Sequence, residues 1–259
     1  MDLGLKGKYT LVTGGTHGIG LAIAAALADE GVNVAVSSRT KERVDGAVAT
    51  LKARGVQVIG LIGDASKLED IEHVFKAVIK KFKTIHILIN NVGGGGSWGK
   101  EDVEGTADDV WTEVYAKNAL AAARFTVLAL PYMRKQKWGR VITIASKHGR
   151  EGGGRPWFTM AKSAEIALMK TFALDPRYAR AGITFNSVAP GNIMIPETGW
   201  AEKQKNDPKG FAALLETLPQ GRFGTPEEVA VLVAFLCSKQ ASHITGASIP
   251  IDGAETKSF

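Results

Sequence analysis

The chain has 259 residues, of which 45% are hydrophobic and 22% charged, and its formal net charge is +6. That length and composition suit one large α/β domain with a two-sided core and require no second domain. The basic residues are scattered rather than gathered in a Lys/Arg-rich block with interleaved aromatic residues, so nucleic acid is not an expected partner.

The cysteine content and the apolar runs exclude further classes. Cys237 is the single cysteine and cannot form an internal disulfide, and no Cys/His cluster has the spacing of a metal site. The first residues lack the pattern of a signal peptide, and no apolar run approaches the roughly 20 residues of a bilayer span. We therefore expect a cytoplasmic protein with no membrane segment and no metal.

Short apolar runs rich in β-branched residues alternate with amphipathic stretches. The runs predict strands at 9–12, 32–37, 56–62, 85–90, 141–145, 184–188 and 247–251. Because they are continuously apolar, they suit the middle of a parallel sheet covered on both faces. Helices are predicted near 18–30, 40–54, 68–82, 106–134, 157–175 and 226–238. This alternation predicts an α/β fold, a Rossmann-like doubly wound parallel sheet in a single domain over 1–259.

The segment 194–224 departs from this regular alternation. It contains Pro196, Pro208, Pro219 and several charges after the end of a strand. Such a long connection predicts a mobile cover over a site rather than a linker. The helix that follows opens at Thr225 with an N-cap, a proline and early acidic residues, which are strong start signals.

A glycine-rich turn follows the first predicted strand and leads directly into a predicted helix. Such a turn lets the backbone approach a pyrophosphate, whose charge the helix N-terminus favours. Because strand, turn, helix and second strand occur in the right order, the sequence predicts dinucleotide binding. The residues concerned are Gly14, Thr16, His17, Gly18, Ile19 and Gly20.

The end of the second strand indicates which dinucleotide binds. Folds of this kind that prefer NAD place an Asp or Glu there to hold the ribose 2′-hydroxyl. This chain instead has Ser38 and Arg39, with Lys41 close by. A guanidinium binds a 2′-phosphate through paired charge-assisted hydrogen bonds, so NADP(H) is favoured.

Several ordered motifs now resemble the short-chain dehydrogenase/reductase family over essentially the whole chain. They are the Thr-Gly-x-x-x-Gly-x-Gly pattern at 13–20, Asp64 after the third strand, Asn90-Asn91-Val92-Gly93 after the fourth, and the run from Asn186 through Pro190-Gly191. The resemblance implies that Asp64 and Ala65 meet the adenine ring, and that Asn91 and Gly93 border the cofactor. It also implies that Pro190, Gly191 and Ile193 flank the nicotinamide, and that a homotetramer forms through the helices 106–134 and 157–175 and the last strand.

The family's reaction centre is an Asn, Ser, Tyr and Lys set, and the matching positions are Asn118, Ser146, Phe158 and Lys162. By resemblance, Ser146 binds the substrate oxygen, Lys162 supplies charge and binds the ribose, and Asn118 holds a water that links the lysine to solvent. A hydride arriving at a carbonyl leaves an alkoxide that needs a proton. Phe158 stands where the family's tyrosine gives that proton, and it has none to give.

Two explanations of Phe158 remain open at this stage. One is a deliberate Tyr-to-Phe change made to trap a ligand complex. The other is a natural variant with a different proton source, such as His148 or Ser146 with water, or with an activated substrate.

The stretch between Ser146 and Phe158 lies where the family lines its substrate cleft. It carries Lys147, His148, Arg150 and Arg155 among many glycines, which suits an anionic or highly oxygenated substrate. A solvated loop with a charge excess is the alternative. A second glycine cluster at 93–99 includes Trp98, which either stacks on a substrate or packs internally. The family also has a Thr at the position of Ile195, so that cofactor contact is in doubt here.

These observations favour an NADPH-dependent carbonyl reductase or the reverse alcohol dehydrogenase, with a small-molecule carbonyl or alcohol as its substrate. The first alternative is a variant that performs conjugate (enone) or imine reduction with Phe158 in place. The second is a catalytically silent NADP(H)-binding protein that acts as a sensor or an oligomer partner.

Overall fold

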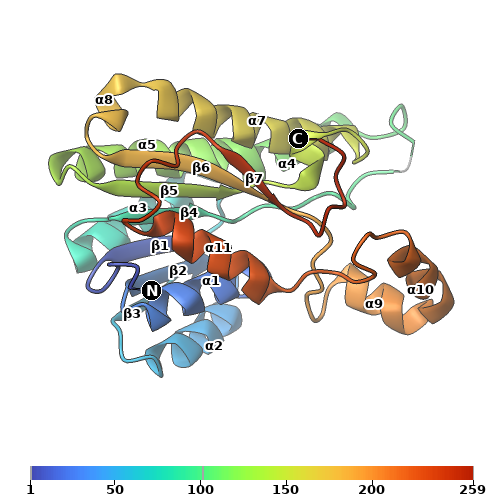
Figure 1. Cartoon of the computed structure of the whole chain (residues 1–259), viewed down its shortest axis with the longest axis horizontal. Helices are drawn as coiled ribbons and strands as arrows, with labels where there is room; N and C mark the ends of the chain where they lie inside the picture. Colours follow the sequence, from blue (N-terminus) through green and yellow to red (C-terminus); the bar gives the residue numbers. More distant parts are fainter. Residues whose placement is uncertain (1, 101, 259) are drawn as a thin grey trace.

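Across residues 2–100 and 102–258, which this computed structural model describes, seven parallel strands form one sheet (Figure 1). The order across the sheet is β3-β2-β1-β4-β5-β6-β7. The chain moves outward from β1 to β3 and then returns to β4, which creates a topological switch point between β1 and β4, where ligands bind in such sheets. The strands are β1 (Tyr9–Thr13), β2 (Asn33–Ser38), β3 (Val58–Ile62), β4 (Ile87–Asn90), β5 (Gly139–Ile144), β6 (Ile183–Pro190) and β7 (Ser248–Ile251).

Burial of the strands explains their continuous apolar runs. Every residue of β4, β5 and β6 is buried, because helices cover both faces of the sheet. On one face lie α1 (Gly18–Asp29), α2 (Lys41–Lys52) and α11 (Pro226–Cys237), and on the other lie α3 (Leu68–Phe82), α5 (Ala121–Lys135) and α7 (Pro156–Leu174) (Figure 1). The predicted doubly wound single-domain α/β fold is confirmed.

The long helix predicted over 106–134 is not one regular helix. It consists of α4 (Asp108–Tyr115), a π-helical turn η1 (Ala116–Leu120) and α5. The turn widens around Asn118, whose Nδ2 donates to the carbonyl oxygen of Val114 at 2.7 Å and to that of Gly94 at 2.9 Å. π-turns occur often at functional sites, and this one directs Asn118 toward the loop after β4.

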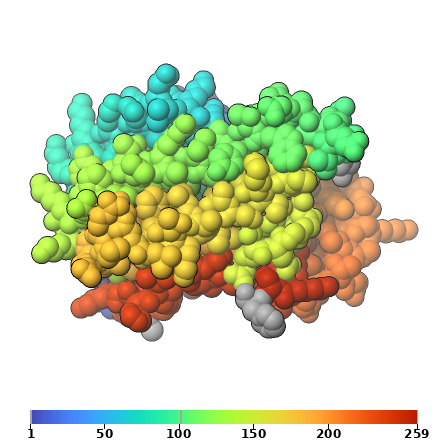
Figure 2. All heavy atoms as spheres, turned by 90° about the horizontal axis from the view of Figure 1, so that it is seen from above, coloured from blue at the N-terminus to red at the C-terminus, as the bar shows by residue number. Residues whose placement is uncertain are grey.

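The segment 194–224, predicted as a cover over a site, contains two helices that were not predicted. They are α9 (Gly199–Asn206) and α10 (Pro208–Glu216), and they project from one end of the molecule (Figures 1 and 2). Asp207 starts α10 by accepting a hydrogen bond from Gly210 N at 2.9 Å, and Pro208 stands at the first helical position. Trp200 and Phe211 both pack on Phe223, at ring distances of 5.1 and 5.2 Å.

The predicted start of α11 is confirmed in detail. The hydroxyl of Thr225 accepts from Glu228 N at 3.3 Å, and Thr225 N donates to the Glu228 carboxylate at 2.9 Å. This reciprocal capping satisfies two amides that the helix itself leaves unpaired. Cys237 lies near the end of the same helix and is fully buried.

Candidate active site

Asn91 holds the glycine-rich turn between β1 and α1. Its Nδ2 donates to the carbonyl oxygens of Thr13 at 3.0 Å and Gly14 at 3.1 Å. Gly20 fits beneath this contact because it has no side chain: a Cβ there would lie 2.3 Å from Gly14 O and 2.4 Å from Asn91 Nδ2. Gly14 itself has a φ of 63°, a left-handed conformation that glycine adopts without strain. The turn thus brings the N-terminus of α1 to the switch point, where it can stabilise a phosphate.

A cleft of about 240 Å³ opens beside this turn. It collects nine of the residues that the sequence assigns to the cofactor, while Gly18, Ile19 and Gly20 form the adjacent start of α1. Arg43 and Lys117 also line the cleft and were not predicted from the sequence, although Arg43 lies four residues after Arg39 and Lys117 directly precedes Asn118. The nine are Gly14, Thr16, His17, Ser38, Arg39, Asp64, Ala65, Asn91 and Gly93.

The cleft is lined by one carboxylate, Asp64, and by the cations Arg39, Arg43 and Lys117. Asp64 accepts hydrogen bonds from Ser66 N at 3.0 Å and Ser66 Oγ at 2.8 Å. Although burial opposes the shift, these bonds and the charge of Arg39 lower the pKa of Asp64, so it is a carboxylate at neutral pH. Burial, followed by the charge of Arg39, lowers the pKa of Lys117. The end of β2 contributes Ser37 and Ser38, and Arg39 and Arg43 follow them in the chain.

Asn118 and Lys162 both lie against Gly93, which lines the cleft. A Cβ on Gly93 would lie 2.5 Å from Asn118 Oδ1 and 3.0 Å from Lys162 Nζ, so only glycine fits there. Asn118 Oδ1 accepts from Gly94 N at 3.1 Å, which fixes the amide. Lys162 Nζ lies 5.8 Å from the centre of the Phe158 ring. The structure therefore brings these three positions together as the sequence predicts.

A second cavity, of about 530 Å³, lies on the other side of Phe158. Ser146 lines it, and its Oγ accepts a hydrogen bond from His148 N at 3.2 Å, which starts the short helix α6 (Lys147–Arg150). The His148 ring meets Phe158 edge-on, with the ring centres 6.4 Å apart. Burial, followed by the charge of Lys147, lowers the pKa of His148, so the imidazole is neutral at pH 7. Among the described residues, nothing bonds its buried Nδ1.

The arginines of the 146–157 stretch donate hydrogen bonds to backbone carbonyl oxygens of the protein. Arg155 lines the cavity and donates to the carbonyl oxygens of Ser97, Trp98 and Gly99 at 2.6–2.9 Å. Arg150 lies outside the lining and donates to Ser248 O at 2.5 Å. Trp98 is also outside it, and its ring lies 3.9 Å from Lys117 Nζ.

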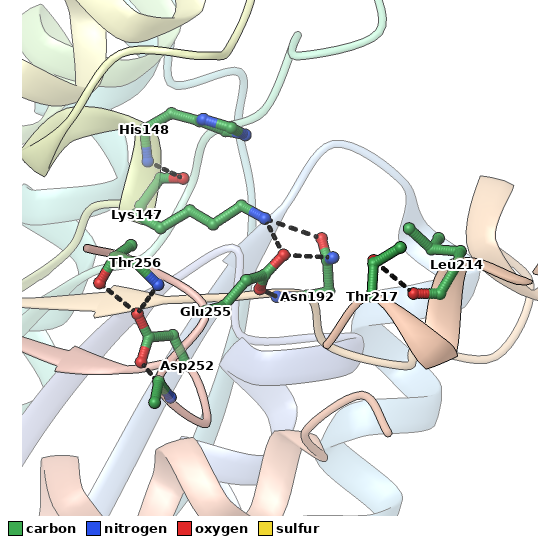
Figure 3. Close-up of polar contacts among 10 residues, drawn as sticks. Lys147, His148, Asn192, Leu214, Thr217, Asp252, Glu255 and Thr256 are labelled. Carbon is green, nitrogen blue, oxygen red and sulfur yellow. Dashed lines mark hydrogen bonds and ion pairs between the residues drawn. The ribbon is translucent and has the colours of Figure 1, made fainter. Parts of the chain in front are cut away.

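Lys147 belongs to a network that ties the C-terminal segment to the site (Figure 3). Its ammonium donates to the Glu255 carboxylate and reaches Asn192 Oδ1 at 3.4 Å. Glu255 also accepts from Asn192 N at 2.9 Å and from Asn192 Nδ2 at 2.6 Å (Figure 3). Asp252 anchors this segment by accepting from Thr256 N at 3.0 Å. The chain after β7 thereby braces the loop that follows β6, where Gly191 lies on the cavity wall.

Comparisons with known proteins match this arrangement. A family model described as Enoyl-(Acyl carrier protein) reductase matches residues 14–254. Human Dehydrogenase/reductase SDR family member 4 is 35% identical over 253 residues, 96% of this chain and 87% of that protein. The chain belongs to the short-chain dehydrogenase/reductase family. It is thus a member of an oxidoreductase family, as the sequence motifs indicate.

Two further members extend the comparison. D-beta-hydroxybutyrate dehydrogenase of Cupriavidus necator is 33% identical over 257 residues, 96% of this chain and 98% of that enzyme. The crystal structure of L-sorbose reductase from Gluconobacter frateurii, complexed with NADPH and L-sorbose, superposes with a TM-score of 0.93 at 31% identity and full coverage of both chains. The short-chain dehydrogenase/reductase assignment therefore holds for sequence and fold alike.

The remaining site positions of this short-chain dehydrogenase/reductase lie at the carboxyl end of the sheet. Pro190 ends β6, and Gly191 follows it into the second cavity. Ile193 is buried and pairs with Gly224 across the base of the segment that carries α9 and α10.

Within residues 2–100 and 102–258, no helix is long and apolar enough to cross a membrane, and no group of His, Cys, Asp and Glu could hold a metal ion.

Proposed function

We propose that this protein is an NADP(H)-dependent oxidoreductase that interconverts a carbonyl compound and an alcohol in the cytoplasm. The preference for NADP(H) over NAD(H) is inferred from the residues after β2, because Ser38, Arg39 and Arg43 line the first cleft. Guanidinium groups attract a 2′-phosphate, whereas the carboxylate of NAD-preferring folds would repel it. The NADPH in the L-sorbose reductase structure supports this choice.

The first cleft suits a dinucleotide, because Gly14 and Gly93 line it without side chains and let the backbone approach the ligand closely. In the proposed arrangement, Asp64 and Ala65 hold the adenine end, and Lys162 with Asn91 and Gly93 borders the ribose end. Pro190, Gly191 and Ile193 would flank the nicotinamide. NADPH, when bound, supplies the hydride.

The residues of the second cavity then handle the substrate oxygen. Ser146 Oγ is accepting from a backbone amide, so its own proton is available to the developing alkoxide. Lys162 supplies positive charge from beneath the Phe158 ring. Because Phe158 has no hydroxyl, the proton must come from another source in the same cavity, where His148 packs on Phe158. Since His148 is neutral at pH 7, it would deliver the proton through its minor imidazolium form or relay it from water, and reduction would be faster at acidic pH.

A second candidate function is one that does not need a tyrosine hydroxyl at position 158. The Phe158 ring lies against His148 and Gly96, and Lys162 donates two hydrogen bonds, to Ile144 O and to Glu165, without a tyrosine hydroxyl. These contacts hold the ring in place but leave the site without a phenolic acid. A natural variant without an acid at this position suits conjugate (enone) reduction, imine reduction or silent NADP(H) binding.

We further propose that the substrate is anionic or highly oxygenated and that α9 covers it. Thr198, Trp200 and Lys203 from this segment line the second cavity together with Lys147 and His148.

A homotetramer built through α4–α5, α7 and β7 is also proposed. Exposed apolar side chains on two of these elements, Leu120 and Val127 on α4–α5 and Met160 on α7, support that assembly.

The deciding experiment measures binding and oxidation of NADPH and NADH with a panel of ketones, keto acids, enones and imines. We expect NADPH to bind and to be oxidised with at least one carbonyl class. Tight NADPH binding with no turnover, both in this protein and in Phe158→Tyr, would identify a silent binding protein. A protein that binds neither nucleotide would contradict the proposal altogether.

Replacing Arg39 by Asp is expected to weaken NADPH binding by about 10–100-fold while leaving NADH binding unchanged or stronger. The change removes a charge-assisted hydrogen bond to the 2′-phosphate, worth about 1.5–3 kcal/mol, and adds a like charge. Fluorescence titration with both nucleotides measures the preference. Lys52→Asp, the same charge change at the far end of α2, is the control and should keep it. Equal losses for both nucleotides in Arg39→Asp would show that Arg39 does not select the 2′-phosphate.

A further inference from the structure

Glu165 is a buried acid that the proposed chemistry does not use. It lies one turn after Lys162 on α7 and is 1% exposed. Lys162 Nζ donates to Glu165 Oε2 at 3.0 Å and to the carbonyl oxygen of Ile144 at 2.9 Å. Lys162 is itself only 4% exposed. The two side chains therefore form a buried ion pair in which neither charge has much access to water.

This pair lies directly under the first cleft. Lys162 Nζ is close enough to Gly93 that a Cβ there would be 3.0 Å away, and Gly93 lines the cleft. On its other side, the ammonium faces the Phe158 ring. A change in the net charge of the pair therefore changes the binding energy of an anion in the cleft, because little water lies between them to screen the interaction.

The protonation of Glu165 is set by two opposing influences. Burial raises its pKa to about 7, although the ammonium of Lys162 opposes the shift. Lys162 in turn lies near Lys117 of η1. The other charged side chains on elements packed against α7 are Asp108, Asp109 and Glu113 on α4, Arg140 on β5, Lys147, His148 and Arg150 on α6, and Arg177 on α8.

We propose that Glu165 is a positioning residue that holds Lys162 beneath the cleft and sets the net charge of the pair next to the cofactor. When Glu165 is protonated, the pair carries one positive charge, and when Glu165 is ionised it carries none. An anionic dinucleotide is therefore bound more tightly by the protonated form, and its binding weakens as pH rises through neutrality. The inference rests on the proposed function because it takes the cleft to be the NADP(H) site.

The test is the dissociation constant of NADPH between pH 5.5 and 9 for the protein and for Glu165→Gln. Gln keeps the shape and the acceptor for Lys162 but cannot ionise. We expect equal affinities at pH 5.5, and above pH 8 an affinity about five-fold weaker in the protein than in the variant. Titration of the 2′-phosphate affects both alike and cancels in their ratio. Glu72→Gln, the same substitution on the surface of α3, should follow the unmodified protein.

A ratio of the two dissociation constants that stays flat from pH 5.5 to 9 overturns the proposal. A second measurement needs no cofactor: the infrared band of a protonated buried carboxyl should disappear from the apo-protein as pH rises through about 7 and be absent from Glu165→Gln. If the band titrates and the ratio of the NADPH dissociation constants changes with pH, but no substrate is reduced, the proposed reductase activity fails and the charge control by Glu165 stands. If the band shows no titration, the inference fails whatever the enzyme reduces.

Discussion

Replacing Phe158 by Tyr is expected to raise the rate of carbonyl reduction by about 10²–10⁴-fold, the usual contribution of a general acid. The ring lies on the wall of the second cavity together with Ser146, so a hydroxyl added to it has access to the substrate oxygen. Lys162 Nζ lies 5.8 Å from the ring centre, and its charge lowers the pKa of a phenol placed near it. Steady-state NADPH oxidation should show the gain in kcat, while the dissociation constant of NADPH stays the same.

Phe158→Leu is the matched control, because it changes the ring without supplying a proton and should bring no gain. Adding Lys162→Met to Phe158→Tyr should remove most of the gain if the lysine activates the hydroxyl. A tyrosine form no faster than the phenylalanine form would contradict the family mechanism for this chain. The proton would then come from the protein's own group, and His148→Asn should abolish the activity.

The fold was predictable because its signals are local. A continuous apolar run rich in β-branched residues, such as Val141 to Ile144 in β5, is typical of a strand buried on both faces of a parallel sheet, and the glycines at 14–20 identify the strand-to-helix turn. The π-turn at Asn118 could not be predicted, since it depends on hydrogen bonds to Gly94, 24 residues away. The start of α10 did carry a signal, Asp207 followed by Pro208, but prolines in the same segment suggested irregular structure instead.

The residues of the candidate site could be predicted from the sequence, but the side chains and carbonyl groups that they bind could not. The positions of Asn118, Ser146 and Lys162 followed from motif spacing, whereas the partners of the cations depend on distant segments. Lys147 meets Glu255 across 108 residues, and no local pattern indicates that contact. Glu165 lies three residues after Lys162, a spacing that allows pairing on a helix, but only the packing of α7 shows that the pair is buried.

Replacing Gly20 by Ala is expected to weaken NADPH binding by about 10–100-fold and to destabilise the fold by about 1–3 kcal/mol. The added Cβ would lie 2.3 Å from Gly14 O and 2.4 Å from Asn91 Nδ2, closer than any real contact. Neither neighbour can move without breaking the hydrogen bonds from Asn91 that hold the turn at 3.0 and 3.1 Å. The turn must therefore shift, and with it the amides that are proposed to hold the pyrophosphate. Nucleotide titration and thermal unfolding measure the two effects.

Gly46→Ala separates this clash from the general effect of adding a methyl group. Gly46 lies inside α2, and a Cβ there meets nothing within 4 Å. The control should therefore stabilise the protein by about 0.5–1 kcal/mol through helix propensity, with NADPH affinity unchanged. Opposite signs of the stability change for the same substitution would locate the requirement for glycine in the turn itself. A Gly20→Ala protein that binds NADPH normally would mean that the turn deforms freely, and the pyrophosphate site would then have to be sought elsewhere along the switch point.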